Sequence, residues 1–421
     1  MSKKIQAIRG MNDLLPADSN IWSFLDSTIS NLLLSYGYKY CRTPNIESTE
    51  TFARAIGEVT DIVEKEMYTW KDNNGDSLTL RPEGTAGVVR MMIEHNLPRE
   101  GIQKVFYNGP MFRHERPQKG RYRQFHQVGA EVFGVSDAKI DAELISITQI
   151  LWKTLGIDAE LEINSLGSAQ SRASYREILS GYFNDNKDQL DEDSLRRLKT
   201  NPLRILDSKN KELESLISGA PKMIDHLDDD SNHHFNALKN YLESLDISYK
   251  VNPKLVRGLD YYNQTVFEWI SNDLGAQGTI CGGGRYDGLV EKMGGNATPA
   301  IGFAMGLERI ALLIEDKSDQ IINKRPHLYF ASIGDSANIE SMNLSKKIIE
   351  ALPHITITND MSIGTLKNQM KKANKSEADF AMILGEQELS EGHISIKPLK
   401  GQGVQQSIKL EGIIHHLQEI L

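Results

Sequence analysis

Cysteine is scarce in this chain of 421 residues, which contains only Cys41 and Cys281. The two are far apart and neither has metal-ligand spacing, so the sequence excludes a disulfide scaffold and a cysteine-based zinc site. No apolar stretch approaches the roughly 20 residues of a membrane span, and no apolar run follows the N-terminal Met-Ser-Lys-Lys-Ile-Gln. We therefore expect no signal peptide, no membrane association and a cytoplasmic location.

Several ligand-binding motifs are missing as well. The chain has no Walker A loop, and the glycine run 282–284 lacks the G-x-G-x-x-G spacing of a dinucleotide site. The doublets His233–His234 and His415–His416 lack a third ligand at suitable spacing and are expected to be solvated, so the sequence predicts no protein-held metal.

Net positive charge is lacking too, since the formal net charge is -9. This excludes a general nucleic-acid coat protein, and a nucleic-acid partner would have to meet local basic patches. The hydrophobic fraction of 39% and charged fraction of 25% are those of a soluble globular protein. The length predicts two or three domains.

The order of predicted elements indicates an α+β protein. Helices are expected at 16–36, 86–95 and 138–155, and strands at 38–44, 78–81, 105–112 and 124–133. Charged helical patterns dominate from about 168 to 250, which predicts a helical insertion. Beyond 326 the pattern becomes βαβαβ, which predicts a small α/β domain with a largely parallel sheet. We therefore expect one domain at 1–325, interrupted at about 168–250, and a second at 326–421.

The most informative stretch is the loop between the strands at 105–112 and 124–133. From Arg113 to Arg123 it holds four arginines and a lysine against one acid, Glu115. Pro117 and Gly120 interrupt the strands and force the loop. A basic loop held by two strands suits a nucleoside triphosphate or a nucleic-acid backbone. The alternative is a solvated hairpin tip.

Two further arginines lie in settings that suggest a site. Arg257 lies in Leu-Val-Arg-Gly-Leu-Asp-Tyr-Tyr, and Arg309 lies in an apolar helix, in Gly-Phe-Ala-Met-Gly-Leu-Glu-Arg. Arg309 could form a buried structural ion pair with Glu308 or another acid. It could equally be a fork donor for phosphate oxygens.

These motifs together resemble histidyl-tRNA synthetases, which are class II aminoacyl-tRNA synthetases. The resemblance runs nearly end to end, through the segments 9–13, 80–85, 111–131, 255–262, 282–289 and 299–310. It implies a class II catalytic domain, built on an antiparallel sheet flanked by helices, and a C-terminal α/β anticodon-binding domain. It also implies the reaction: ATP activates L-histidine to histidyl-adenylate, and histidine then passes to the 3′ end of histidine tRNA, releasing AMP and pyrophosphate. Mg²⁺ is expected to accompany ATP, and the segment 16–44 resembles the family's dimer motif, which implies a homodimer.

The resemblance also implies residue roles. Arg113 would hold the α-phosphate of ATP, Arg309 the γ-phosphate and Arg121 the outer phosphates, while Glu115 would accept from the adenine amino group. Arg257 would bridge the substrate carboxylate and the α-phosphate, where other class II enzymes use a metal ion. Arg113, Arg257 and Arg309 are thus the expected catalytic residues.

A neutral imidazole offers one N–H donor and one nitrogen acceptor. By the resemblance, Glu131 would take the donor and the Tyr262 hydroxyl the other nitrogen, with Tyr261 beside it. By the same resemblance, Glu83, Thr85 and Gln127 would accept from the α-ammonium and Arg257 would contact the carboxylate. Gly84 and Arg113 are also expected to bind histidine. Two structural alternatives stay open. Glu83 could be a helix N-terminal acid, and Tyr262 a core aromatic.

The basic loop holds more donors than one triphosphate uses, so we expect Arg116, Gln118 and Arg123 to contact tRNA. Two rival functions remain. One is the catalytically silent regulatory subunit of ATP phosphoribosyltransferase, a relative that lacks the anticodon-binding domain. The other is a class II synthetase for proline, glycine or threonine, against which Glu131 and the segment 257–262 argue.

Overall fold

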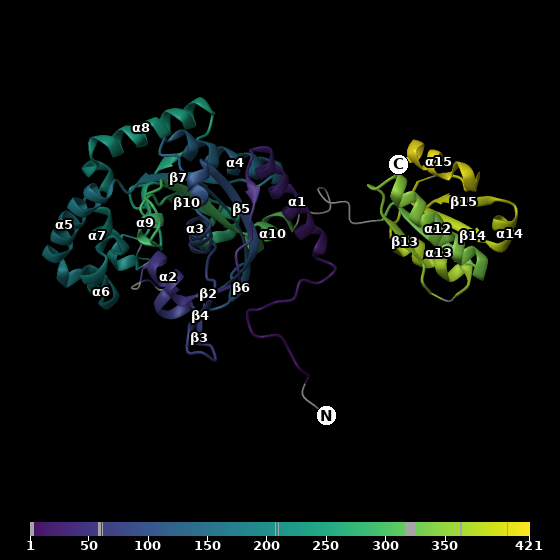
Figure 1. Cartoon of the computed structure of the whole chain (residues 1–421), viewed down its shortest axis with the longest axis horizontal. Coiled ribbons are helices and arrows are strands. Elements are labelled where there is room, and N and C mark those ends of the chain that lie inside the picture. Colours follow the sequence, from purple (N-terminus) through teal and green to yellow (C-terminus); the bar gives the residue numbers. More distant parts are fainter. Residues whose placement is uncertain are drawn as a thin grey trace. The chain divides into compact units, whose positions relative to one another are not determined.

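The computed structural model describes residues 4–57, 60, 62–206, 208, 210–315, 326–362, 364–401 and 403–421. The chain divides into two compact units, Met1–Ser318 and Asp319–Leu421, both drawn in Figure 1. The boundary expected between residues 325 and 326 falls at the edge of a segment outside the described residues, so its position stays a prediction.

An eight-stranded sheet organises the first unit, in the order β1-β5-β6-β11-β10-β9-β7-β8. The six strands from β5 to β7 pair antiparallel, and only the edge strands β1 and β8 pair parallel to their neighbours. The expected antiparallel sheet is therefore confirmed. Its strands are β1 (Lys39–Tyr40), β5 (Gln103–Phe112), β6 (Gln124–Phe133), β7 (Glu160–Ser165), β8 (Lys250–Val251), β9 (Asn263–Ile270), β10 (Thr279–Arg285) and β11 (Ala300–Gly306).

Two expected strands differ in their bounds. The strand expected at 38–44 is shorter in the structure, where β1 spans only two residues. The glycine run 282–284 lies within β10 rather than after a strand. There it packs against β9 and β11, both antiparallel to β10.

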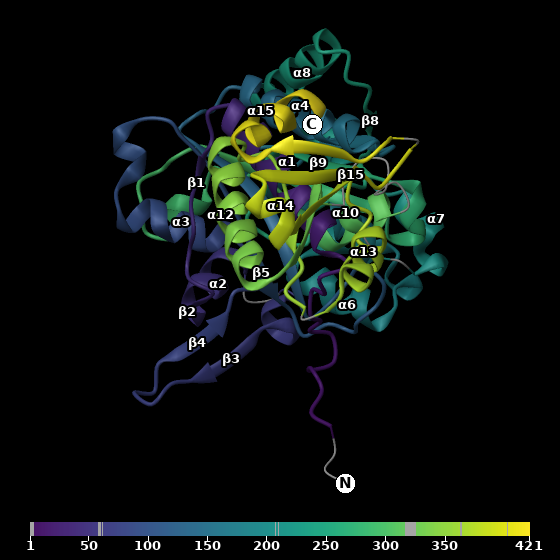
Figure 2. The same ribbon diagram turned by 90° about the vertical axis from the view of Figure 1, so that its right-hand side faces the viewer.

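The helices of this unit flank the sheet. The helix expected at 16–36 begins at Ser19 and buries Ile21, Leu25, Ile29 and Leu33, a four-residue spacing that marks one face. A small sheet, in the order β2-β4-β3, carries a hairpin that projects from the unit (Figure 2). The elements outside the main sheet are α1 (Ser19–Ser35), β2 (Ile46–Ser48), α2 (Thr49–Ile56), β3 (Tyr68–Lys71), β4 (Ser77–Leu80), α3 (Thr85–Glu94), α4 (Lys139–Leu155), α9 (Leu289–Lys292) and α10 (Leu307–Ile314).

The insertion between β7 and β8 is helical, as expected, and has a core of its own. Its α-helices are α5 (Ala169–Asp185), α6 (Glu192–Thr200), α7 (Glu214–Ser218) and α8 (Asp229–Ser244), and α5, α6 and α7 gather at one side of the unit (Figure 1). Its core includes Tyr175, Leu179 and Phe183 of α5. One expectation here was wrong: His234 of α8 is not solvated, because its Nε2 lies 2.8 Å from the buried Asp141 Oδ2.

The second unit has a five-stranded sheet in the order β13-β12-β14-β15-β16. Only β12 with β13 and β12 with β14 pair parallel, so the expectation of a largely parallel sheet was wrong for the last two strands. The connection from β14 to β15, residues 386–392, is too short for a parallel crossover. The elements are β12 (Leu328–Ile333), α12 (Asp335–Ala351), β13 (Ile357–Asn359), α13 (Leu366–Lys375), β14 (Phe380–Gly385), α14 (Glu386–Ser390), β15 (His393–Pro398), β16 (Gln406–Lys409) and α15 (Ile413–Ile420).

No helix in the described part of the chain combines the length and the apolar character that crossing a bilayer requires.

Candidate active site

A cavity of about 180 Å³ lies over β6, β10 and β11, beside the loop 113–123 that joins β5 to β6. Six residues expected at a site, from three stretches that are far apart in the sequence, line this one cavity. They are Arg113, Glu115, Arg121, Gln127, Arg257 and Arg309.

The basic loop 113–123 is held at both ends and at its tip. Arg113 N donates to Arg123 O at 2.8 Å, and Gln118 and Arg121 exchange backbone hydrogen bonds of 3.0 and 2.9 Å. Gly120 has a φ of +73°, a left-handed conformation that glycine adopts without strain. The loop is therefore an ordered turn with defined side-chain directions.

Arg113 has a fixed guanidinium. Its Nε donates to Pro82 O at 2.8 Å, and the group lies over the Phe125 ring at 5.3 Å from the centroid. Such a contact orients the fork of donors toward the cavity. Glu115 and Arg121 face each other across the loop at 3.6 Å, a partly exposed pair of small energetic weight.

Arg257 forms an ion pair with Glu268 of β9 and lies over the Tyr262 ring at 5.7 Å from the centroid. Burial lowers the pKa of Arg257, but the Glu268 carboxylate and the hydroxyls of Tyr262 and Tyr261 together raise it more, so the net shift is upward and the group stays charged. Gly282 makes the approach possible, because a Cβ there would lie 2.6 Å from Arg257 Nη1. Glu268, which sequence reasoning missed, also accepts from Thr279 Oγ1 at 2.9 Å.

Arg309 reaches the cavity from the first turn of α10 and donates to the Thr279 carbonyl oxygen. Burial and the nearby Arg121 lower the pKa of Arg309, and Glu115 opposes them. The neighbouring Glu308 has another partner. Its carboxylate accepts from the His126 backbone N at 2.8 and 3.0 Å.

A second, buried set of polar side chains lies at Glu131, near the C-terminal end of β6. Thr85 Oγ1 donates to Glu131 Oε1 at 2.7 Å, and the Tyr286 hydroxyl donates to Oε2. The side chain of Glu131 is removed from solvent, and this burial raises its pKa to about 8. Tyr286 was not singled out from the sequence, although it lies in the matching segment 282–289.

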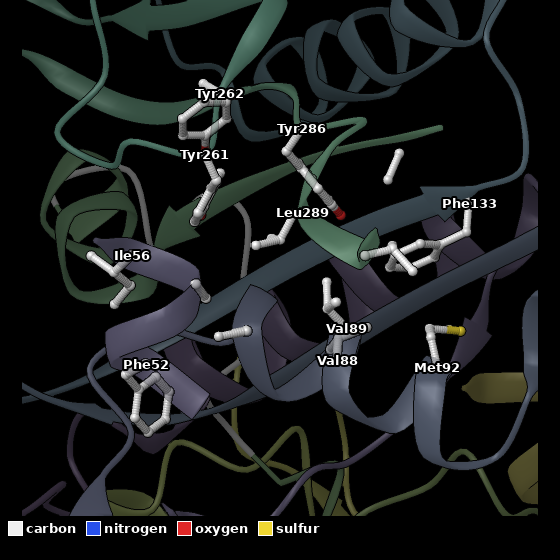
Figure 3. Close-up of a cluster of buried hydrophobic side chains, with 14 of the residues drawn as sticks. Phe52, Ile56, Val88, Val89, Met92, Phe133, Tyr261, Tyr262, Tyr286 and Leu289 are labelled. Atoms are coloured by element: carbon white, nitrogen blue, oxygen red, sulfur yellow. The ribbon is translucent and has the colours of Figure 1, made fainter. Parts of the chain in front are cut away.

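The tyrosines Tyr261 and Tyr262 are buried beside this set, with ring centroids 4.6 Å apart. In Figure 3 they and Tyr286 enter the hydrophobic cluster from one side, while Val88 and Val89 of α3 enter it from the other. Tyr261, Tyr262 and Tyr286 thus belong to the same hydrophobic cluster as the buried face of α3.

Glu83 has the structural role that the sequence left open. Its two carboxylate oxygens accept from the backbone N of Thr85 at 2.7 Å and of Ala86 at 2.8 Å, at the start of α3. Burial raises the pKa of Glu83 and these N–H donors lower it, with a net rise. The adjacent Gly84 leaves space for Tyr107, since a Cβ on Gly84 would lie 2.3 Å from that ring.

Gln127 is notable for an unused acceptor. Its Oε1 is buried and accepts no hydrogen bond from the residues that the structure describes. Buried acceptors are nearly always satisfied, so an unsatisfied one facing a cavity suits a donor on a ligand.

The three residues expected at the nucleic-acid contact lie in the basic loop. Arg116 and Gln118 are exposed near its tip. Arg123 is half-buried, and its Nε donates to Glu115 O at 3.3 Å, so this side chain is folded back onto the loop.

Two further cavities adjoin the first. One of about 470 Å³ beside α1 and α10 shares Tyr122 and Glu308 with it, but its described lining has five acids and no arginine or lysine, which does not suit a triphosphate. The other, of about 210 Å³, shares Arg113, Glu115, Arg121 and Arg257, and is also lined by Arg197 and Arg204 of the insertion. The insertion therefore borders the site.

Metal ligands are not gathered here. Within the described residues, no group of three or more histidine, cysteine, aspartate or glutamate side chains is placed to hold a metal ion.

Comparisons with known proteins cover the whole chain. Residues 10–310 match the family described as Histidyl-tRNA synthetase, and residues 332–420 match the family described as Anticodon binding domain. A protein of Ruthia magnifica subsp. Calyptogena magnifica, named histidine–tRNA ligase, is 62% identical over 420 residues, which is 100% of both chains. One of the same name from Vesicomyosocius okutanii subsp. Calyptogena okutanii is 59% identical over 420 residues, again 100% of both. The crystal structure of apo S. aureus histidyl-tRNA synthetase is 35% identical, with a TM-score of 0.81, and the match covers 98% of this chain and 99% of that one.

Proposed function

The chain belongs to the histidyl-tRNA synthetase family, and on that premise we propose that the arginine-lined cavity binds ATP and that the pocket at Glu131 binds histidine. The overall reaction of the chain, the attachment of histidine to tRNA, follows from this membership. What we propose is which residues bind ATP, which bind histidine and which contact tRNA.

One observation carries the proposal: Arg113, Arg257 and Arg309, which are far apart in the sequence, line the same small cavity. Their guanidinium groups are fork donors of the kind that bind phosphate and carboxylate oxygens. Phosphoryl and adenylyl transfer depend largely on positioning and on charge stabilisation. Several pre-positioned cations around one cavity supply both.

In this proposal Arg113 holds the α-phosphate of ATP, Arg309 and Arg121 hold the outer phosphates, and Glu115 accepts from the adenine amino group. Arg257 contacts both the histidine carboxylate and the α-phosphate. Its charge screens the repulsion between the two anions and stabilises the charge that develops at phosphorus. Mg²⁺ accompanies ATP as part of the substrate.

The histidine side chain is proposed to lie between Glu131, which accepts its N–H, and the Tyr262 hydroxyl, which bonds the other nitrogen. The unsatisfied Gln127 Oε1 is a suitable acceptor for the α-ammonium. Thr85 and Glu83 complete this end of the pocket. Although Glu83 caps α3, each carboxylate oxygen has a second lone pair for the ammonium.

Transfer to tRNA is proposed to involve the tip of the basic loop, at Arg116 and Gln118, with Arg123 behind it. The second unit, residues 332–420 of which match the family described as Anticodon binding domain, is proposed to bind the anticodon of histidine tRNA. The expected domain bounds, 1–325 and 326–421, are part of this proposal.

We also propose a homodimer and a cytoplasmic location. The dimer proposal rests on the segment 16–44, which resembles the family's dimer motif and contains α1. Sedimentation should give the mass of two chains at micromolar concentration, and a stable monomer of 47.3 kDa would contradict it.

The proposed amino-acid specificity is tested by ATP–pyrophosphate exchange with each amino acid in turn. Histidine alone should support exchange. Exchange with proline, glycine or threonine instead would indicate another class II specificity. Absence of exchange with every amino acid would favour the regulatory subunit of ATP phosphoribosyltransferase. That alternative is not favoured, because full-length relatives at 62% and 59% identity are named histidine–tRNA ligases.

A further inference from the structure

The helical insertion contacts the catalytic segment 258–262 directly, through side chains that donate hydrogen bonds. Arg204 Nη2 donates to Gly258 O at 2.9 Å and to Asp260 Oδ1 at 3.2 Å. Asn201 Nδ2 donates to the same Asp260 oxygen at 3.0 Å. Arg204 and Asn201 lie in the turn that follows α6, so one short part of the insertion holds two points of the segment.

The far end of the segment has a third contact from the insertion. Arg172 of α5 donates to the Tyr262 backbone carbonyl oxygen. Burial lowers the pKa of Arg172 and the carboxylate of Asp260 opposes this, with a net fall. A small cavity of about 50 Å³ between the insertion and the segment is lined by all these side chains.

On its other side the segment lies against the end of α2. Asp260 N donates to Ile56 O at 3.3 Å. Gly57 follows with a φ of +100°, and a Cβ on it would lie 2.7 Å from Asp260 Oδ2. The segment is therefore clamped between α2 and the insertion.

The clamp matters because the segment has no strand ladder of its own. It lies between β8, which ends at Val251, and β9, which begins at Asn263, and it includes or adjoins Arg257, Tyr261 and Tyr262. Sheet register does not fix those side chains, so their positions depend on side-chain contacts: the ion pair of Arg257 with Glu268, and the contacts of the insertion at Gly258, Asp260 and Tyr262. Misplacing a catalytic group by about 1 Å costs on the order of 10²-fold in rate.

We propose that Arg204, with Asn201 and Arg172, is a positioning residue for histidine activation, which makes the insertion part of the amino-acid activation machinery. The bond to Gly258 O sets the backbone next to Arg257, and the bonds to Asp260 set the approach to Tyr262. This inference rests on the proposed function, because it assigns to the insertion the geometry of the site that activates histidine.

The test is steady-state pyrophosphate exchange, without tRNA, on the full chain. R204A should lower kcat by roughly 10- to 100-fold. The KM for ATP should stay within about twofold, because no ATP contact is removed. The melting temperature should change by no more than about 4 °C, since Arg204 and Asp260 are a partly exposed pair. R204K should recover part of the lost kcat, because one ammonium can still reach Gly258 O.

A double-mutant cycle with Asp260 separates positioning from general damage. If Arg204 acts through Asp260, R204A/D260A should be no slower than the more damaged single variant. R176A is the matched control: Arg176 is also an insertion arginine, but it donates to Thr200 O within the insertion. Its kcat should stay within about twofold of wild type.

Wild-type kcat in both R204A and N201A would overturn the inference, as would an equal loss in R176A. Should R204A fail to fold, N201A still tests it, because that variant removes one hydrogen bond to Asp260 and no charge. Different results would contradict the proposed function and the role of the insertion. Wild-type protein without histidine-dependent exchange contradicts the proposed function. Wild-type exchange that is unchanged in R204A contradicts only the role of the insertion.

Discussion

Glu131 and Gly302 are register partners on β6 and β11, and a Cβ on Gly302 would lie 1.6 Å from Glu131 Oε2. Because Gly302 has no side chain, the Glu131 carboxylate can occupy the space next to its Cα. There the Glu131 carboxylate accepts hydrogen bonds from the hydroxyls of Thr85 and Tyr286, and the residue is 1% exposed. The proposed histidine pocket thus depends on a residue that contributes no chemistry of its own.

Gly302→Ala should therefore damage histidine recognition more than any other property. The methyl group must displace the carboxylate or push β11 from β6, an overpacking strain of about 1–3 kcal/mol. We expect the KM for histidine in pyrophosphate exchange to rise at least about tenfold and the melting temperature to fall. Gly288→Ala is the control, because a Cβ there would meet nothing within 4 Å. A wild-type KM in Gly302→Ala would show that Glu131 is not a histidine ligand.

Glu131 should also make stability depend on pH. Burial raises its pKa to about 8, against roughly 4.3 for an unfolded glutamate. The folded chain therefore retains a proton that the unfolded chain releases. The retained proton adds to the free energy of unfolding. This stabilisation is complete below about pH 4.3 and is lost as the pH rises toward 8, with a slope of up to about 1.4 kcal/mol per pH unit.

Denaturant midpoints of the ligand-free protein, measured from pH 5 to 8, should thus fall less steeply in Glu131→Gln than in wild type. The amide does not titrate, while Glu83, the other buried acid of this region, is present in both proteins. Parallel pH profiles would place the titration elsewhere. The same variant should raise the KM for histidine and leave that for ATP little changed, because an amide oxygen is a weaker acceptor than a carboxylate.

Long elements with clear boundaries were predictable from the sequence, and contacts between distant elements were not. The strands β5 and β6 and the helix α4 were predicted within two residues at either end, because periodicity and flanking turn residues are local signals. The strands β15 and β16 were not predicted, because their pairing depends on where the chain returns to the sheet after α14.

The same distinction holds in the site. Residues in matching motifs could be nominated, and six of them line one cavity. Glu268 could not, because it meets Arg257 only once β9 is placed beside the segment 255–262. Arg204 lies in a stretch without any motif, and its contact to Asp260 arises from how the insertion packs. For Tyr286 the sequence does contain a signal, because it is an aromatic residue in the segment 282–289.

Arg257→Ala should remove most of the adenylate-forming activity without unfolding the chain. One guanidinium is proposed to serve two anions, and deleting a comparable oxyanion donor costs about 10²- to 10³-fold in kcat. Glu268 is left with Thr279 as a partner, so some loss of stability is expected as well. Pyrophosphate exchange and thermal unfolding measure the two effects separately. Exchange at near-normal kcat would exclude the proposed role.

Glu268→Gln is a companion to this variant. It preserves the shape of the Arg257 partner and removes only its charge, so it should cost less in kcat than Arg257→Ala. If it costs as much, the ion pair itself, and not the guanidinium alone, carries the effect.

Arg116 and Gln118 should act in transfer to tRNA and not in amino-acid activation. Both are exposed near the loop tip, and neither lines the arginine-rich cavity. Gln118 can donate and accept, which suits a base edge, and Arg116 suits a phosphate or the guanine acceptors. In this family the loop is expected to face the extra guanosine at the 5′ end of histidine tRNA.

Arg116→Ala and Gln118→Ala should therefore keep pyrophosphate exchange at the wild-type rate and slow the transfer of histidine to tRNA. The slowing should be strongest with tRNA that carries the extra guanosine. Equal losses in both half-reactions would assign these residues to the ATP site, and no loss in either would leave the loop tip as a solvated turn.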